Sequence, residues 1–163
     1  MFGKLHHSLV GWVMVAVILA TGYYVALTYP NPADDALARG EVYIYFVDDT
    51  SNATDVLPVR RDIKKNQSLE VAIPLVAEEL FKGPTLKERD GGLSTAIPEG
   101  VKLVDSRMEG KTAVLNFNDR IEQVAGSATV GLIRKQLEMT FDHLPGILDV
   151  ELQVGGRPIL LEP

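Results

Sequence analysis

The side chains that could begin covalent chemistry in this chain are two hydroxyl groups beside a pair of glycines. Ser94 and Thr95 follow Gly91 and Gly92, and the only histidine beyond residue 7 is His143. A serine nucleophile needs a base within hydrogen-bond reach, and no G-x-S-x-G turn surrounds this serine. Because loop hydroxyls more often bond to nearby backbone, the pattern disfavours nucleophilic catalysis.

Groups that could hold a metal ion or a cofactor are scarce. The sequence contains no cysteine, which excludes disulfides, thiolate metal sites, cysteine nucleophiles and a lipidated cysteine within it. The carboxylates of Asp34, Asp35, Asp48 and Asp49 lack the spacing of a calcium-binding loop. The glycine pair at 91–92 lacks the Gly-Lys-Ser/Thr sequence of a phosphate-binding loop. We therefore predict no catalytic set, no metal site and no cofactor.

Four basic residues form the main cationic cluster of the sequence: Arg60, Arg61, Lys64 and Lys65. This cluster is consistent with a solvated strand edge whose charges discourage strand-to-strand aggregation. It is also consistent with a docking patch for an acidic partner or for a cell-wall polymer. Nucleic acid is not an expected ligand, because 22 acidic residues outnumber 16 basic ones and the net charge is −6.

An uncharged stretch covers residues 5–33. Its core, residues 8–27, would span about 30 Å as a helix, which is the thickness of the hydrocarbon core of a bilayer. Trp12 lies near one end and Tyr23 and Tyr24 near the other, where amphipathic rings prefer the membrane interface. Pro30 then stops the helix. We predict a cytoplasmic tail at 1–7, a transmembrane signal anchor at 8–28 and a linker at 29–40.

The flanking charges predict the orientation of this anchor. Lys4 precedes it and Asp34 and Asp35 follow it, so the N-terminus is expected inside and the rest of the chain outside the cytoplasmic membrane. A cleaved signal peptide is the alternative. Its apolar region usually has about 7–15 residues, fewer than the run seen here. Both interpretations place the remaining residues outside the cytoplasm.

The remaining residues alternate between strand-like and helix-like patterns. Residues 42–47 and 56–63 are rich in β-branched or aromatic residues, and Pro58 places the second of these strands at a sheet edge or at a bulge. Apolar residues then recur with helical spacing from Leu69 to Phe81. Because Pro74 is tolerated only in a first turn, the helix is expected to become regular near Pro74. Residues 101–108 and 112–117 alternate around Gly110, which predicts a β-hairpin.

A second amphipathic helix is predicted over residues 127–143, followed by a last long strand over residues 148–154. The predicted order is β-β-α-β-β-α-β. Each helix has one apolar stripe and the strands have one apolar face. This pattern predicts an α/β (α+β) domain at 41–163, with two helices packed on one face of a mixed sheet.

The long connection at residues 85–100 has an unusually apolar middle, so we expect that part to pack back on the domain. It contains the candidate interaction loop: Gly91, Gly92, Leu93, Ser94, Thr95, Ala96, Ile97 and Pro98.

Four segments, in this order, resemble the GerM domain (GerMN) family of sporulation and spore germination: residues 76–85, 92–100, 114–117 and 136–146. The resemblance covers roughly residues 41–161, and the segment 92–100 is its most specific part. It implies a non-enzymatic bacterial envelope domain, with a fold similar to the ring-building α/β modules of secretion-type complexes. The best-known members carry two such domains and a lipidated cysteine. This sequence has one domain and an expected transmembrane anchor instead.

The sequence therefore predicts a membrane-anchored extracytoplasmic interaction or assembly module of the bacterial envelope. Other envelope proteins, or further copies of the chain, are the expected partners, and the N-terminal helix is the expected membrane contact. A peptidoglycan-binding domain is the alternative, using the loop and the basic cluster. A wall-active hydrolase is the least favoured hypothesis, because acid, base and metal sets are missing.

Overall fold

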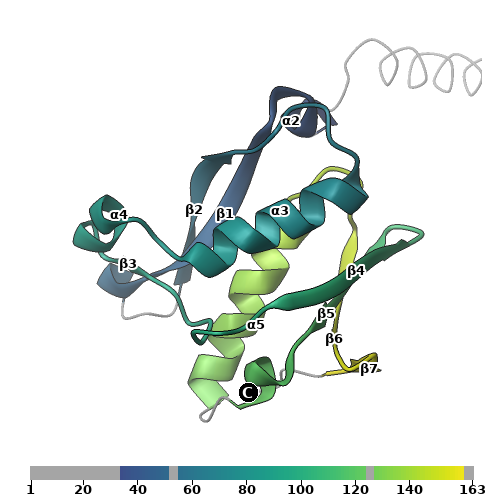
Figure 1. The fold of residues 1–163 in the computed structure, drawn as a ribbon. Helices are drawn as coiled ribbons and strands as arrows, with labels where there is room; N and C mark the ends of the chain where they lie inside the picture. The colour runs from purple at the N-terminus through teal and green to yellow at the C-terminus, as the bar shows by residue number, and fades with distance from the viewer. Residues whose placement is uncertain (1–33, 52–54, 124–126, 160–163) are drawn as a thin grey trace, which may run out of the picture. The chain divides into compact units, whose positions relative to one another are not determined.

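The computed structural model describes residues 34–51, 55–123 and 127–159 (Figure 1). The chain divides into two units, residues 1–35 and residues 36–163, and the fold below is that of the second. The transmembrane anchor predicted at 8–28 lies outside the described residues. Within the ranges that are described, no helix is both long enough and apolar enough to cross a membrane.

The regular elements follow one another in the predicted order, with several short additions. The two main helices are α3 (Leu69–Lys82) and α5 (Ser127–Asp142), and the short ones are α2 (Asp34–Arg39) and α4 (Leu86–Asp90). The strands are β1 (Glu41–Asp48), β2 (Asp55–Asp62), β3 (Leu93–Ser94), β4 (Leu103–Glu109), β5 (Thr112–Phe117), β6 (Asp149–Val154) and β7 (Arg157–Pro158). Two 3-10 turns, Asp49–Ser51 and Asp119–Glu122, complete the described elements.

The strands form two sheets. The first has the order β2-β1-β3 and is antiparallel throughout, and Pro58 lies opposite Tyr45 in its edge strand β2. The second has the order β4-β5-β6-β7, in which β5 and β6 are parallel and the other pairs are antiparallel. The edge position of Pro58 and the β4–β5 hairpin at Gly110 confirm two predictions from the sequence, since Gly110 takes a φ of 65° that favours glycine in a tight turn.

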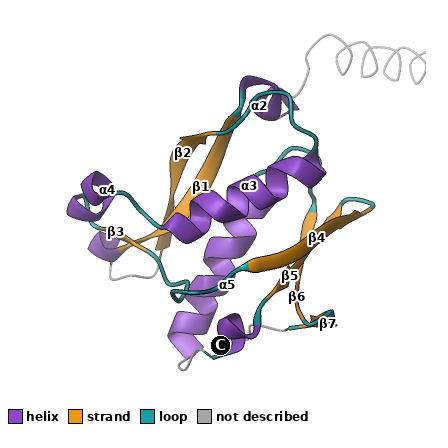
Figure 2. Ribbon diagram, in the orientation of Figure 1, coloured by secondary structure: helices purple, strands orange, loops and turns teal. Residues whose placement is uncertain are grey.

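The prediction of one mixed sheet is wrong. Along the side of β1 away from β2, the backbone N–H of Tyr45 donates to the hydroxyl of Thr140 in α5 at 3.1 Å. Strand β3 pairs with this edge opposite Val47 and Asp48, and at Tyr45 helix α5 accepts the hydrogen bond that a longer strand would have to make. Helices α3 and α5 each contact strands of both sheets, so they are not confined to one face of a single sheet (Figure 2).

One apolar core joins the two sheets and the two main helices. Phe46 of β1, Phe117 of β5 and Phe141 of α5 are fully buried in it, together with Leu80 and Leu137. The stripes predicted on both helices are the faces that enter this core. The core therefore fixes α3 and α5 relative to both sheets, which matters for the surface between α3 and the segment that follows β3.

Candidate functional site

The candidate interaction loop begins at Gly91, directly after the last residue of α4, and continues into the short strand β3. Gly92 has a φ of 89°, and a Cβ added there would lie 2.6 Å from the side-chain methyl of Thr50. Only glycine fits both the backbone conformation and this close approach. The carbonyl of Gly92 also accepts the backbone N–H of Asp49 at 2.9 Å. Strand β3 therefore starts from a fixed point at the end of β1.

The two hydroxyls of the loop are engaged within the fold. The Ser94 hydroxyl donates to a carboxylate oxygen of Asp49 at 2.8 Å. The Thr95 hydroxyl lies within hydrogen-bond distance of both side-chain amide atoms of Gln136, at 3.1 and 3.3 Å. The same amide oxygen accepts the backbone N–H of Ala96 at 3.0 Å, and Gln136 is fully buried. These contacts tie the loop to the 3-10 turn that follows β1 and to α5.

His143 is the residue that was considered from the sequence as a base for Ser94. Its imidazole Nδ1 lies 2.8 Å from the backbone carbonyl of Met139, and its ring lies 4.8 Å from that of Tyr45. The hydrogen bonds of the serine and of the histidine therefore go to different groups. The described residues also contain no group of three or more His, Cys, Asp or Glu residues that could hold a metal ion.

The chain after the loop is held by a second amide. The Asn118 side chain donates to the carbonyl of Gly100 at 2.8 Å and accepts the backbone N–H of Lys102 at 3.1 Å. Between the two amide contacts, Ile97 and Val101 are buried in the core. Residues 94–102, which we call the rim, are thus fixed at both ends and anchored between them.

A groove runs between the rim and the C-terminal half of α3. It consists of two adjoining hollows of about 390 and 470 Å³, which share Phe81, Lys82, Gly100 and Val101 as lining. The first hollow extends toward Arg89 and Ser94, and the second toward Pro74 and Leu103. We call this feature the α3 groove. Four residues of the candidate loop line it: Ser94, Thr95, Ile97 and Pro98.

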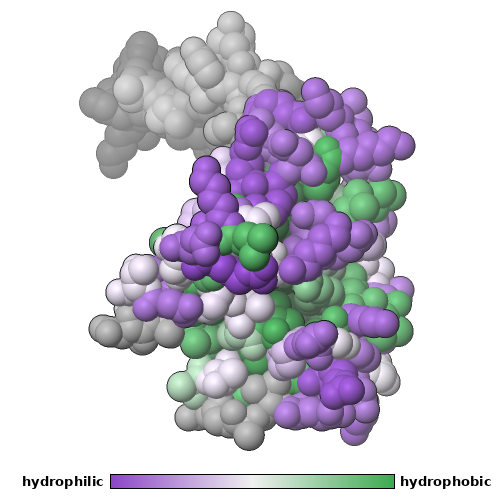
Figure 3. All heavy atoms as spheres, turned by 60° about the vertical axis from the view of Figure 1, so that its left-hand side comes forward, coloured by the Kyte–Doolittle hydropathy of each residue, from purple (hydrophilic) through white to green (hydrophobic). Residues whose placement is uncertain are grey.

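Apolar residues dominate the lining of the α3 groove, and the charged residues in it are Glu78, Lys82, Arg89, Glu99 and Lys102. Of these, Lys82 is paired with Glu79 at 2.7 Å and with Glu78 at 3.0 Å. Figure 3 shows hydrophobic surface gathered across the lower half of one face, with hydrophilic surface above and below. The groove thus combines apolar contact area with charged groups suited to orienting a ligand.

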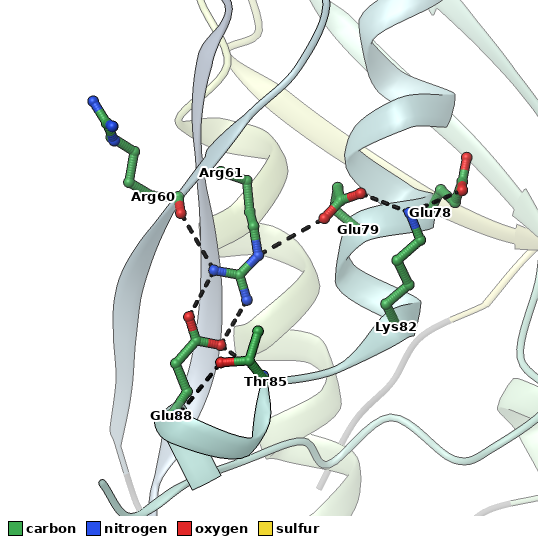
Figure 4. A network of polar contacts seen from close by, with 7 residues as sticks. All are labelled: Arg60, Arg61, Glu78, Glu79, Lys82, Thr85 and Glu88. Atoms are coloured by element: carbon green, nitrogen blue, oxygen red, sulfur yellow. Dashed lines mark hydrogen bonds and ion pairs between the residues drawn. The ribbon is translucent and has the colours of Figure 1, made fainter.

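An ion-pair network holds α4 against β2 and α3 (Figure 4). The Arg61 guanidinium donates to both carboxylate oxygens of Glu88, at 2.8 and 2.7 Å, and lies 3.8 Å from Glu79. The Glu88 carboxylate also accepts the backbone N–H of Thr85 in a capping box at the start of α4. The Arg61 hydrogen bonds, despite partial burial, lower the pKa of Glu88 to about 2.

The four residues of the predicted basic cluster have different roles. Arg61 is only 14% exposed in its side chain, and its guanidinium lies over the ring of Phe46 at 5.6 Å. The Arg60 side chain points away from this network (Figure 4) and pairs with Glu41 at 2.9 Å.

Lys64 and Lys65 follow the end of β2 and are exposed, with no ion pair to any other described residue. The structure therefore does not gather the four cations of the cluster into one surface.

Sequence reasoning missed the residues that hold the groove in shape. Thr85 and Glu88 were detectable, because a threonine followed three positions later by glutamate is the pattern of a capping box. Gln136 lies on the stripe that contains Ile133 and Leu137, where a polar residue signals a buried hydrogen bond. Asn118 gave no comparable signal.

The chain is similar to known proteins over most of its folded part. The sequence model of the Germane family, described as sporulation and spore germination, matches residues 43–160. None of the curated proteins matches the chain.

Two solved structures from Bacillus subtilis are similar to the fold. One holds the tandem GerMN domains of the sporulation protein GerM (TM-score 0.58, 22% identity, 76% of this chain and 44% of that chain). The other is the first GerMN domain of the same protein (TM-score 0.53, 15% identity, 73% and 85%). The chain thus spans less than half of the tandem structure. At these identities the likeness shows the fold.

Proposed function

Because the chain belongs to the Germane family of sporulation and spore germination proteins, we propose that its folded part is an interaction module of the bacterial envelope. The module binds partner proteins through the α3 groove and performs no chemistry of its own. The observation that carries this proposal is the groove itself, whose rim is fixed by Gln136 at one end and by Asn118 at the other.

The fixed rim matters because ordering a loop on binding costs free energy. A rim already held by the side-chain amides of Gln136 and Asn118 avoids most of that cost, so more of the contact energy appears as affinity. The hollows of about 390 and 470 Å³ fall within the usual range of ligand sites. The rim hydroxyls of Ser94 and Thr95 serve the fold through their bonds to Asp49 and Gln136, which favours binding over catalysis.

The proposal includes a membrane tether. Residues 8–28, inside the uncharged stretch 5–33, anchor the module in the cytoplasmic membrane with its folded part outside. External protease added to spheroplasts should then degrade the folded part while a cytoplasmic control protein survives. Protection of the folded part in intact spheroplasts would contradict this topology.

Site-specific photocrosslinking tests the groove as the binding surface. A photoreactive residue at Pro98 on the rim should give discrete adducts in living cells. The same residue at Leu148, which is 73% exposed and not among the lining residues, should not give them. Lys82 lines both hollows, so Lys82→Trp should abolish the adducts, whereas Lys87→Trp outside the groove should leave them.

Two outcomes would redirect or overturn the proposal. If adducts from Pro98 persist in the Lys82→Trp variant, the partner does not bind in the groove. An absence of adducts would count against a partner protein bound there. Salt-sensitive binding to purified cell wall that ignores Lys82→Trp would favour a wall-polymer role through charges elsewhere. An adduct of two copies of the chain would identify self-association as the interaction.

A further inference from the structure

We propose that the α3 groove binds a short extended peptide segment in which acidic residues flank apolar ones. This inference rests on the groove being the binding surface, as proposed above, and adds the chemistry of its ligand. It follows from the length of the groove, the position of its unpaired charges and the way α4 is held.

The groove has room for about four extended residues. Its lining on α3 runs from Pro74 to Lys82, and eight helical steps at about 1.5 Å each cover about 12 Å. An extended chain advances about 3.3 Å per residue. The groove consists of two adjoining hollows, one toward each end. We therefore expect a bound segment to run along both hollows rather than to insert into one enclosed cavity.

The charges left unpaired in the groove are mainly positive. Lys82 is neutralised by its two glutamates, whereas Arg89 in the first hollow and Lys102 in the second form no ion pair with any other described residue. Arg120 adds a third cation beside the rim, because a Cβ on Gly100 would come within 3.8 Å of its guanidinium. Glu99 is the opposing charge on the rim.

The unpaired charges of the groove are thus mainly positive although the net charge of the chain is −6. One unpaired cation lies in each hollow, and the lining that the two hollows share includes the apolar residues Phe81 and Val101. This arrangement complements a ligand with carboxylates on either side of apolar side chains. A glycan fits less well, because its hydroxyls would lose water against apolar lining without gaining enough hydrogen-bond partners.

Arg89 is held in place by the ion-pair network rather than by its own contacts. Helix α4 has five residues, none of them buried, and a helix this short is not stable alone. Its position depends on Glu88, which binds Arg61 on β2 and the capping Thr85. Arg61 is therefore a positioning residue for the cation that follows Glu88 in the sequence.

Selection from a displayed library of random 12-residue peptides on the full-length chain in nanodiscs tests the inference. Enriched peptides should carry Asp or Glu on both sides of apolar residues. Their affinity should fall at least about tenfold in the double variant Arg89→Gln/Lys102→Gln, with a weaker dependence on salt. The matched control Lys64→Gln/Lys65→Gln removes the same charge outside the groove and should bind like the wild type.

The outcomes separate this inference from the proposal on which it rests. Peptides that lose binding with Lys82→Trp but bind Arg89→Gln/Lys102→Gln normally would overturn the acidic ligand and leave the groove as the binding surface. Enrichment of basic peptides would likewise overturn the acidic ligand and leave the groove as the binding surface. If no peptide depends on Lys82→Trp, both proposals fail. Circular dichroism of each variant confirms that it is folded.

Discussion

Replacing Glu88 by glutamine removes one charge from the ion-pair network and preserves the shape of the side chain. The Arg61 guanidinium, 14% exposed, would keep only Glu79 at 3.8 Å as an anionic partner. We expect Glu88→Gln to lower the free energy of unfolding and to loosen α4, because the poorly solvated Arg61 cation loses the negative charge beside it and one of its two acceptor oxygens.

The size of the effect follows from the pKa of Glu88. A fall from the ordinary value of 4.5 to about 2 corresponds to about 3 kcal/mol, at about 1.4 kcal/mol per pH unit. The carboxylate side chain is 20% exposed, so solvent screening reduces this figure. We therefore expect a loss of about 1–2 kcal/mol at pH 7.

The dependence on pH distinguishes this explanation from a general loss of packing. The pKa of Glu88 is lower in the folded chain, so its contribution is complete above about pH 4.5 and is lost as the pH falls toward 2. Urea unfolding of the full-length chain, followed by far-ultraviolet circular dichroism, should show the two proteins differing at pH 7. The difference should shrink steadily between pH 4.5 and 2.

The matched control is Glu109→Gln. Arg107 and Glu109 form an ion pair of the same 2.8 Å length, but their side chains are 46% and 56% exposed. Such a pair should contribute less than about 0.5 kcal/mol. Equal effects of the two substitutions, or a Glu88→Gln effect that is as large at pH 2.5 as at pH 7, would refute the reasoning.

Gly92→Ala should cost more than Gly110→Ala in urea unfolding, by about 1–3 kcal/mol, because both have positive φ but only Gly92 faces a side chain at 2.6 Å; equal costs would contradict this. Gln136→Leu should lower the free energy of unfolding by about 1–3 kcal/mol and speed hydrogen exchange at Ala96, whose N–H loses its acceptor. Unchanged exchange would show that Gln136 does not hold the rim. Asp142 is exposed, but partial desolvation and the nearby carboxylates of Glu138 and Asp149 raise its pKa, so the protonated form that the fold favours is lost as the pH rises. Asp142→Asn should therefore raise the melting temperature at pH 7 more than at pH 3, and an equal rise would count against this.

Much of the fold could be predicted from local patterns. The apolar spacing around Ile73 and Leu80, and again around Ile133 and Phe141, predicted the two main helices with their buried faces. The expectation that the middle of the long connection packs back on the domain is confirmed, since Ile97 is buried in the core. The family was also predicted from the sequence. The membrane anchor, the partners and the assignment of site residues stay predictions.

The remaining features could not be read from patterns, for physical reasons. Periodicity reports which face of an element is buried, since burial depends on each residue's own side of the helix or strand. It does not report which element lies across that face. The contact in which Thr140 accepts the N–H of Tyr45 at an edge of the first sheet, for example, joins residues 95 positions apart, so no local pattern contains it.

Because sequence patterns do not report contacts between elements, the basic cluster at residues 60–65 was interpreted as one surface. Arg60 and Arg61 are neighbours in the chain, but successive strand residues point to opposite faces of a sheet. One therefore pairs with Glu41 near the surface and the other with Glu88 between elements. The sequence by itself determined the two main helices, the longer strands, the buried faces of the helices and the family, but not the short elements α2, α4 and β3. Only the tertiary structure decided which charges are paired within the fold and which remain in the α3 groove for a ligand, because that depends on distances between segments far apart in the chain.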